Sequence, residues 1–322
     1  MSLALTGRAV DNNVVQVVWS GTAATVTVAD NISQYVSVSS GTSSHVVITQ
    51  SSDFAGVDAT ADNEDGEIFY VLSGTSADGS LTLNGSYKCE IDLNGLTLTN
   101  TSGPAFIILN GKRIAISAKK GTTNSLADAA NTTYKGCIHV KGHTKLKGKG
   151  TLNVTGNSAH GIWSKEYIEV KNITLNITAA QKDGIHCREY FLQESGTVSI
   201  SGAGDDGIQV ELDDEADSTG ATTGHEDENS GNFYMEDGTL TISGYGSKAV
   251  KTDGTITWSG GTWNFNTADV TENAASGIGT VSLVTAGADG YYDLLGRPVE
   301  ASQAKGLIIV KNNGQYNKVI IK

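Results

Sequence analysis

The chain has 322 residues, a formal net charge of −13 from 22 basic and 35 acidic residues, and glycine at 39 positions. Glycine exceeds its usual ~7 % share, Thr, Ser, Val, Ile and Asn are abundant, and helical stretches rich in Leu, Glu and Lys are missing. This composition predicts an all-β protein with many short strands. The negative charge argues against nucleic acid and anionic membranes as partners, but divalent cations could still link the chain to an acidic polymer.

No run of about 18 apolar residues occurs, so we expect no transmembrane segment. The start, Met1-Ser2-Leu3, lacks the charged and apolar regions of a signal peptide, yet the rest of the chain is typical of secreted or cell-surface β proteins. The cysteines, Cys89, Cys137 and Cys187, are too few and odd in number for a disulfide framework. We expect them to be buried apolar fillers.

The N-terminal part of the chain shows short β runs without a fixed period. Residues 1–66 contain such runs at 25–28 and 45–48, separated by Gly/Ser turns, and we expect a cap or small β module there. Residues 67 to about 135 contain further alternating runs, for example at 81–83. These runs predict the first, irregular coils of a solenoid.

A regular repeat follows and determines the predicted fold. Segments that alternate between apolar and polar residues open with threonine at intervals of 23, 23, 42 and 23 residues: Thr151, Thr174, Thr197, Thr239 and Thr262. A second set of small residues has the same intervals of 23, 23 and 42: Gly161, Gly184, Gly207 and Ala249. One insertion therefore interrupts an otherwise constant coil. Coils stacked ~4.8 Å apart would bury their apolar residues and align Thr, Asn and Ser in outward ladders.

This repeat predicts a right-handed parallel β-helix over residues 67–275, with coils of about 23 residues. A leucine-rich repeat has a similar period, but its signature is absent, and a propeller would need a period of about 40 residues. The last segment, 276–322, contains strand-like runs at 307–310 and 318–321 and is expected to form a C-terminal β segment. The expected domains are thus 1–66, 67–275 and 276–322.

The residues before the repeated small residues form a column of charged and polar groups across the predicted coils: Lys135, His160, Asp183, Asp206 and Lys248. Asp205 stands beside Asp206, so carboxylates of adjacent coils come ~5 Å apart. Their repulsion costs on the order of 1–3 kcal/mol unless a cation offsets it, and calcium takes about 6–8 oxygen ligands. We predict a calcium site at Asp183, Asp205 and Asp206. Turn residues that bond their own backbone are the alternative.

The insertion, residues 211–230, is rich in Asp and Glu. It lacks the EF-hand spacing and is expected to be a solvated loop, or alternatively to add ligands near the predicted calcium site. Four other residues are candidates for carbohydrate contact: Trp163, Tyr190, Arg188 and His160. Their structural alternatives are packing aromatics and a hydrogen-bonded turn histidine.

With the repeat and the Asp-Gly turns together, the chain resembles a carbohydrate-binding β-helix family first described from a cellulolytic clostridial bacterium. The resemblance covers about residues 67–270 and rests on KKGTTNSLAD at 119–128, GKGTLNV at 148–154, KDGIH at 182–186 and GDDGI at 204–208. It implies a secreted, calcium-binding, three-faced β-helix that binds cellulose or acidic pectic polymers and is related to pectate lyases. On this match the three aspartates take calcium positions, whereas Asn124 and Asp128 fall in a motif expected to be structural.

The C-terminal segment carries a second resemblance. The sequence YDLLGRPV at 292–299, followed by KGLIIV at 305–310, resembles the C-terminal sorting or cap segment of secreted Bacteroidetes proteins. This resemblance also implies an extracytoplasmic location.

Two functions of different classes follow from these observations. The first is a non-catalytic, monomeric carbohydrate-binding protein, in which the outward Thr and Asn ladder matches an extended polysaccharide and calcium bridges to its carboxylates. The second is a polysaccharide lyase, in which calcium neutralises a uronate carboxylate and Lys248 or Lys251 removes the adjacent proton. We expect binding, because two lysines near a candidate metal site are weak support for catalysis.

Overall fold

The computed structural model describes residues 10–39, 43–129, 134–215, 220–272, 290–292, 298–300, 306–312 and 315–321. The chain divides into two units, Met1–Asn273 and Ala274–Lys322. The described residues are all-β apart from two short 3₁₀ helices, η1 (Asp30–Ile32) and η2 (Thr267–Asp269). Neither helix is long or apolar enough to cross a membrane.

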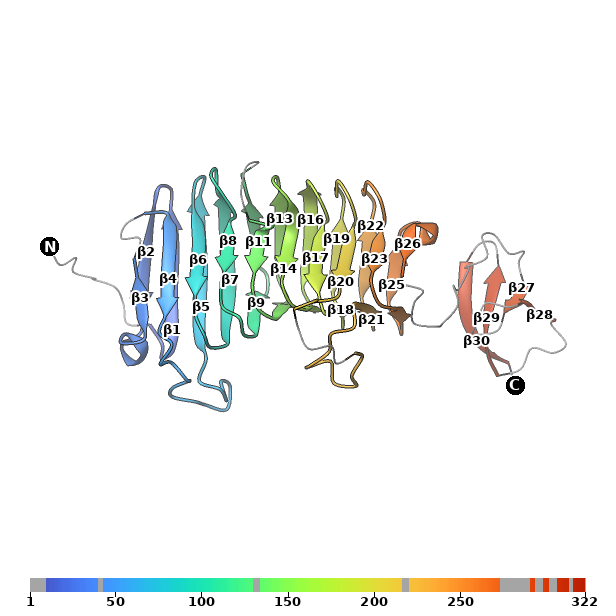
Figure 1. Ribbon diagram of the computed structural model, residues 1–322, viewed down its shortest axis with the longest axis horizontal. Coiled ribbons are helices and arrows are strands. Elements are labelled where there is room, and N and C mark those ends of the chain that lie inside the picture. The colour runs from blue at the N-terminus through green and yellow to red at the C-terminus, as the bar shows by residue number, and fades with distance from the viewer. Residues whose placement is uncertain are drawn as a thin grey trace. The chain divides into compact units, whose positions relative to one another are not determined.

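From residue 114 onward the strands of the first unit recur in threes, and equivalent strands of successive triplets pair in parallel (Figure 1). The first face consists of β9 (Ile114–Ala118), β12 (Thr144–Gly148), β15 (Ile168–Lys171), β18 (Tyr190–Gln193), β21 (Asn232–Met235) and β24 (Ile256–Trp258). The second face consists of β10 (Thr123–Ala127), β13 (Thr151–Gly156), β16 (Thr174–Ala180), β19 (Thr197–Ile200), β22 (Thr239–Ile242) and β25 (Thr262–Asn264).

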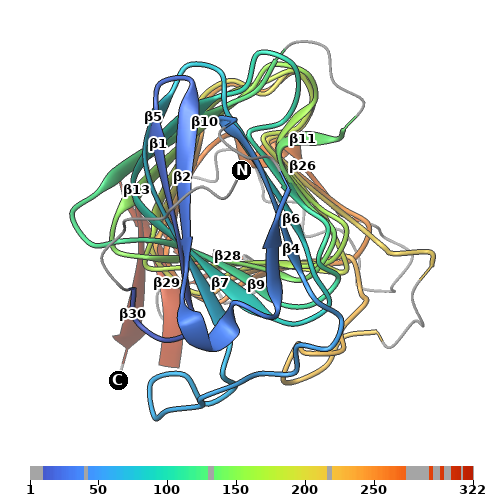
Figure 2. The same ribbon diagram turned by 90° about the vertical axis from the view of Figure 1, so that its left-hand side faces the viewer.

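The third face is a separate sheet of 10 strands. It consists of β3 (Val36–Val38), β4 (His45–Gln50), β6 (Ser80–Asn84), β8 (Phe106–Ile108), β11 (Gly136–Val140), β14 (His160–Ser164), β17 (Ile185–Arg188), β20 (Ile208–Glu211), β23 (Val250–Thr252) and β26 (Val270–Thr271). All its pairs are parallel except β3 with β4. Viewed along the stack in Figure 2, the sheets surround a common interior.

The predicted threonine ladder is present on the second face. Thr151 pairs with Thr174, Thr174 with Thr197, Thr197 with Thr239, and Thr239 with Thr262. The interval of 42 residues is bridged because the insertion leaves the coil between β20 and β21. The prediction of an all-β protein with long parallel sheets is confirmed, and the arrangement is that of a β-helix-like solenoid.

The interior explains the column of small residues found in the sequence. Apolar side chains from all faces form one buried core. A Cβ atom on Gly161 would lie 2.6 Å from the carbonyl oxygen of Gly184, and one on Gly207 would lie 2.5 Å from that of Ala249. The coils therefore approach too closely at this column for larger residues.

The N-terminal strands extend the same sheets. β1 (Val14–Ser20) pairs antiparallel with β2 (Ala23–Val28) and parallel with β5 (Ile68–Ser76). β7 (Cys89–Thr99) pairs with β5, with β9 along its first half and with β10 along its second, so it joins the first and second faces. The expected cap or module thus belongs, in its described part, to the first unit.

The second unit contains a four-stranded antiparallel sheet of β27 (Gly290–Tyr292), β28 (Pro298–Val299), β29 (Gly306–Asn312) and β30 (Gln315–Ile321). The two C-terminal strand-like runs lie in β29 and β30. Most of the sorting-type motif at 292–299 lies outside the described residues. In the first unit, the three cysteines are free and buried, as expected of apolar fillers.

Candidate functional site

The third face carries a row of outward side chains that changes character from strand to strand. Core-facing and outward residues alternate along each strand. In register, His139 pairs with Trp163, Trp163 with His186, His186 with Gln209, and Gln209 with Lys251. These five residues are called the outer row below. Rings, an amide and an ammonium group succeed one another at ~4.8 Å steps, which suits a ligand with varied contacts along its length.

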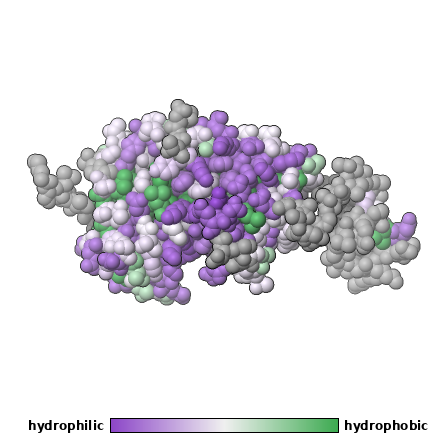
Figure 3. Space-filling view, in the orientation of Figure 1, coloured by the Kyte–Doolittle hydropathy of each residue, from purple (hydrophilic) through white to green (hydrophobic). Residues whose placement is uncertain are grey.

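A cavity of about 390 Å³ lies beside the outer row, and its lining includes Lys135, His160, Trp163, Lys182, His186 and Glu211. Trp163 stacks on His139, with ring centroids 4.5 Å apart, and Lys135 Nζ lies 4.6 Å from the centre of the indole. Trp163 is only 6 % exposed, so it forms a wall of the cavity rather than an open platform. Figure 3 shows hydrophilic side chains gathered over the middle of the solenoid, with hydrophobic ones nearer its N-terminal strands.

The residues that precede the repeated small residues are linked from coil to coil, each side chain to the backbone N–H of the next. Asp183 N–H points to His160 Nδ1 at 3.3 Å, Asp206 N–H donates to Asp183 Oδ1 at 3.0 Å, and Lys248 N–H donates to Asp206 Oδ1 at 2.9 Å. The two aspartate side chains thus accept from the equivalent residue of the next coil. These contacts give the aspartates a structural role between coils, which differs from the turn alternative, in which they would bond their own backbone.

One carboxylate oxygen of this column, Asp206 Oδ2, accepts no such hydrogen bond from the next coil. A carboxylate oxygen each of Asp183, Asp205 and Asp206 lies within 4.8 Å of the others. Asp206 is 1 % exposed, and its Oδ2 is buried without a hydrogen-bond partner, 3.6 Å from Lys251 Nζ. Burial raises the pKa of Asp206, and the charge of Asp183 adds to the effect. A buried carboxylate oxygen whose only contact is an ion pair at 3.6 Å can accept a further ligand, so these oxygen donors fit a hard cation such as calcium.

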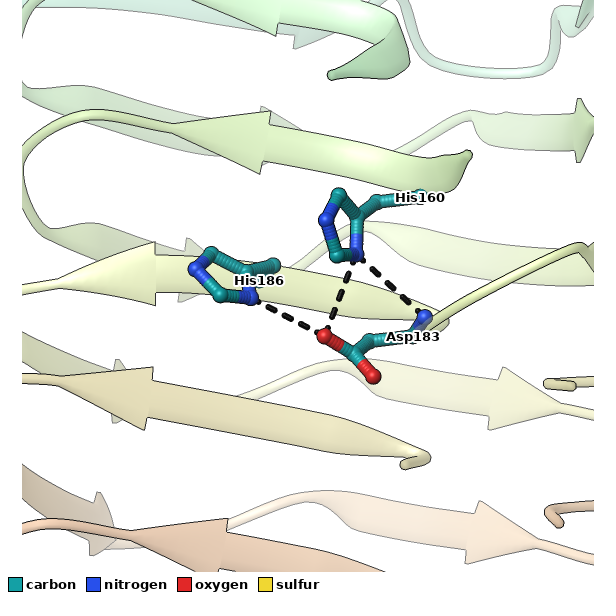
Figure 4. A group of neighbouring side chains, drawn as sticks. All are labelled: His160, Asp183 and His186. Carbon is teal, nitrogen blue, oxygen red and sulfur yellow. Dashed lines mark hydrogen bonds and ion pairs between the residues drawn. The ribbon is translucent and has the colours of Figure 1, made fainter. Parts of the chain in front are cut away.

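Two histidines converge on the other oxygen of Asp183 (Figure 4). Asp183 Oδ2 lies 2.9 Å from His186 Nδ1 and 3.1 Å from His160 Nδ1, and His186 Nε2 lies 3.3 Å from Glu211 Oε2. Burial alone would raise the pKa of Asp183, but hydrogen bonds from both histidines outweigh it and hold the pKa well below its usual range. Burial lowers the pKa of His160. Burial would also lower that of His186, but Asp183 and Glu211 outweigh it and raise the pKa.

The structure brings some predicted sugar contacts together and separates others. Trp163 and His160 line the cavity. Arg188 lies on the third face in register with Glu211, and its Nη1 pairs with Asp213 Oδ1 at 2.8 Å. Lys251 belongs to the outer row, whereas Lys248 contacts Asp206 through its backbone.

Tyr190 lies elsewhere, on β18 of the first face, and is fully buried. Its hydroxyl donates to Glu169 Oε1 at 2.7 Å, and its ring stacks on Tyr167 at 4.7 Å and meets His225 at 5.3 Å. Stacking on a sugar does not fit this position, because the ring is already covered by other side chains.

Some residues of the acidic insertion are buried and bond to residues of the solenoid strands, so the insertion is not wholly solvated. Asp213 is buried and pairs with Arg188, and Glu228 is buried and accepts from Tyr234 Oη–H at 2.7 Å and Asn232 Nδ2 at 3.2 Å. The expectation of a solvated loop is therefore wrong for these residues. Among the described residues, no carboxylate of the insertion joins the group of Asp183, Asp205 and Asp206, although Glu211 at its start lies 3.3 Å from His186 Nε2.

Asn124 and Asp128 have the structural roles expected of them. Asn124 Oδ1 accepts from the N–H groups of Gly95 and Leu96, both at 2.9 Å, and Asp128 Oδ2 accepts from Ser158 Oγ at 2.8 Å. Both side chains hold neighbouring coils together.

Several site residues escaped the sequence reasoning, notably His186, Gln209 and Glu211. A signal for them exists, because His186 and Gln209 follow the repeated small residues Gly184 and Gly207 by two positions. Trp163 and Lys251 occupy the same place in their coils. Following that offset along the repeat would have found the outer row.

The profile of a family described as "Carbohydrate-binding domain-containing protein" matches residues 56–291. A protein of that description from Acetivibrio thermocellus is 26 % identical over an alignment of 117 residues that covers 33 % of this chain and 41 % of the relative. The match thus spans less than half of the relative's length. A solved polysaccharide lyase-like protein from C. thermocellum, a gadolinium derivative, is similar at a TM-score of 0.57 and 20 % identity, covering 80 % of this chain and 98 % of that one. At this identity the likeness concerns the fold.

Proposed function

The chain belongs to the family of carbohydrate-binding domain-containing proteins, and from this premise we propose that it binds an extended acidic polysaccharide along the outer row of the third face. In this proposal the solenoid is a secreted right-handed parallel β-helix, and Asp183, Asp205 and Asp206 hold calcium beside the polymer. The observation that carries the proposal is the outer row itself, a line of unlike side chains that a cavity accompanies. Parallel connections in one sheet are right-handed in ~98 % of cases, which supports the handedness.

The charge distribution around the cavity supports an acidic ligand. The chain carries a net charge of −13, yet Lys135 and Lys182 both line this cavity. Within the described part of the chain, neither ammonium group has a carboxylate partner, and that of Lys135 lies over Trp163 instead. A uronate carboxylate would give them one.

Calcium would supply the remaining positive charge. Asp206 Oδ2 is available to it, Asp205 is exposed, and Asp183 lies on the preceding coil. These residues would hold the ion, and the polymer's own carboxylates and water would complete its coordination. The ion would thereby link two acidic partners.

The test is retention on polygalacturonate with and without calcium. We expect the double variant Lys182→Ala/Gln209→Ala to bind at least about tenfold more weakly, a change of about 1.4 kcal/mol. Ser199→Ala, which changes an outward residue of the second face, serves as the matched control and should bind like the parent chain. Equal retention of the two variants, or none by the parent, would contradict the proposal.

A lyase is the second candidate function, favoured by one observation. Lys251 belongs to the outer row, and its Nζ lies 3.6 Å from Asp206 Oδ2, beside the proposed calcium. There, calcium would neutralise a uronate carboxylate, and Lys251 as a neutral amine would take the proton from the adjacent carbon. A C=C bond would form as the bond to the leaving sugar oxygen breaks, and that oxygen would take a proton from solvent. Ultraviolet absorbance of unsaturated product from polygalacturonate, lost in Lys251→Ala, would establish it. Binding without product supports the first candidate.

A further inference from the structure

Three donor atoms meet at the edge of the cavity in a geometry that suits a small metal ion. His160 Nδ1 and His186 Nδ1 lie 3.1 and 2.9 Å from Asp183 Oδ2, and one ligand atom from each of the three residues lies within 4.8 Å of the others. Zinc bonds of about 2.0–2.1 Å at tetrahedral angles place neighbouring ligand atoms about 3.3 Å apart. Calcium takes oxygen ligands at longer range, so two imidazole nitrogens do not suit it.

We propose that His160, Asp183 and His186 bind a divalent transition metal of the zinc class through these three atoms. The site goes beyond the proposed function. It shares Asp183 with the proposed calcium site, whose other ligands would be Asp205 and Asp206, and its own ligands are His160 and His186. Imidazole with carboxylate is a ligand set typical of zinc and of neighbouring metals of the first row.

The hydrogen-bond arrangement around His160 supports the proposal. Its Nδ1 faces a donor, Asp183 N–H at 3.3 Å, and an acceptor, Asp183 Oδ2 at 3.1 Å. A protonated Nδ1 leaves the Asp183 N–H without an acceptor, and a bare Nδ1 turns its lone pair toward those of the carboxylate. A metal ion between the rings and the carboxylate removes the second conflict, because the lone pairs of all three atoms then bind the ion. The Asp183 N–H at 3.3 Å then has no acceptor, just as it would have none beside a protonated Nδ1.

Glu211 provides an independent observation. Its Oε2 lies 3.3 Å from His186 Nε2, on the side of the ring away from Asp183. A carboxylate that accepts the N–H of one ring nitrogen fixes the other nitrogen as a metal ligand, and such partners are usual around bound zinc. Glu211 is thus placed as a positioning residue for His186.

The cavity leaves the proposed metal an open position. Both histidines line it, together with Lys182 and Glu211. Three protein ligands and a fourth position open to water or a ligand oxygen are the coordination of catalytic rather than structural zinc sites. An oxygen of a bound sugar could occupy that position.

The experiment uses the full chain without a histidine tag, titrated with Co²⁺ followed by visible absorption and with Zn²⁺ followed by calorimetry. We expect about one ion per chain, with affinity at least about 100-fold lower in His160→Ala and His186→Ala and about 10- to 100-fold lower in Glu211→Gln. His143→Ala is the matched control, because His143 has two carboxylate partners, Glu166 and Glu189. It should bind like the parent chain.

Asp205→Ala separates the two metal sites, since it should leave Co²⁺ binding unchanged while it weakens calcium binding. The transition-metal site is overturned if the parent chain binds neither Co²⁺ nor Zn²⁺, or if His186→Ala and His143→Ala bind them equally. If His186→Ala fails to fold, as circular dichroism would show, Glu211→Gln decides, and unchanged affinity in that variant counts against the site. Loss of polygalacturonate binding alone would contradict only the proposed function.

Discussion

The second and third faces are built from equivalent strands, yet their outward residues differ in kind. On the second face like residues repeat and bond to one another: Asn176 Nδ2 donates to Asn153 Oδ1 at 2.9 Å, and Asn153 Nδ2 to Ser125 Oγ at 3.3 Å. On the third face the outer row changes at every strand. Along the second face polar groups bond to like residues of the ladder, whereas outer-row residues bond to unlike residues: Gln209 Nε2 donates to Glu211 Oε1 at 2.8 Å, and His186 Nδ1 lies 2.9 Å from Asp183 Oδ2.

This difference bears on where a polysaccharide would lie. The sequence suggested the Thr and Asn ladder as the binding surface, but the amides of that ladder already bond to one another on the second face. The cavity and the metal-ligand clusters lie at the third face and its turns. The proposal therefore uses the face with the irregular residues.

The largest expected effect lies beneath both faces. Ile177 under the second face and Ile185 under the third are fully buried in one core. Replacing either with alanine should lower the free energy of unfolding by about 2–5 kcal/mol, because each leaves a cavity. Urea denaturation followed by circular dichroism measures both. A much smaller loss for Ile185→Ala would mean that the third face does not share the core.

Calcium removal should affect only the turns of the third face. Calcium at a hundredfold excess over its Kd stabilises the folded chain by about 2.7 kcal/mol, so a chelator should lower the Tm. Asp206→Ala should abolish most of this dependence, because it removes the buried carboxylate oxygen that no hydrogen bond satisfies. Asp227→Ala, in the insertion, should retain it. A Tm that ignores both chelator and Asp206→Ala would leave the aspartates as turn residues alone.

Two histidines should give opposite pH dependences of stability. Burial alone would lower the pKa of His143, but hydrogen bonds to Glu166 and Glu189 outweigh it and raise the pKa to about 9. Burial, with the charge of Lys135, lowers the pKa of His139 to about 4. Against an unfolded value of about 6.5, the contribution of His143 is complete below pH ~6.5 and is lost as the pH rises towards 9. That of His139 is complete above ~6.5 and is lost as the pH falls towards 4.

Each contribution should amount to about 1–2 kcal/mol after screening by solvent. Thermal unfolding between pH 4 and about 9 measures both limbs. His143→Ala should flatten the alkaline limb and His139→Ala the acid one. An alkaline limb that survives in His143→Ala would show that its two glutamate contacts do not stabilise the fold.

Substitutions of outward residues should have the smallest effects on stability, and they best distinguish which face binds the polymer. Asn176→Ala removes one ladder bond and should cost about 0.5–1 kcal/mol while polygalacturonate retention stays unchanged. Gln209→Ala should cost less than about 0.5 kcal/mol and weaken retention. Denaturation and retention measured on the same two proteins give the comparison. The reverse pattern would place the polymer on the second face.

The sequence alone determined the all-β class, the parallel register and the place of the insertion. Alternation within a strand and the interval between Thr151 and Thr174 are properties of short stretches, and stacking then aligns equivalent residues automatically. The small residues at Gly161, Gly184 and Gly207 carried the same information, because the coil spacing leaves no room for a Cβ there.

Only the tertiary structure decided which aligned residues meet and what covers them. His160 and His186 lie on neighbouring strands, yet their convergence on one oxygen of Asp183 depends on side-chain directions that the repeat does not specify. An aromatic ring such as that of Tyr190 can stack on a sugar. In the solenoid, however, Tyr190 lies on the first face, where Tyr167 and the insertion residue His225 cover its ring. The period fixes the position of each Cα in the stack, whereas a site also depends on rotamers and on contacts between residues far apart in sequence.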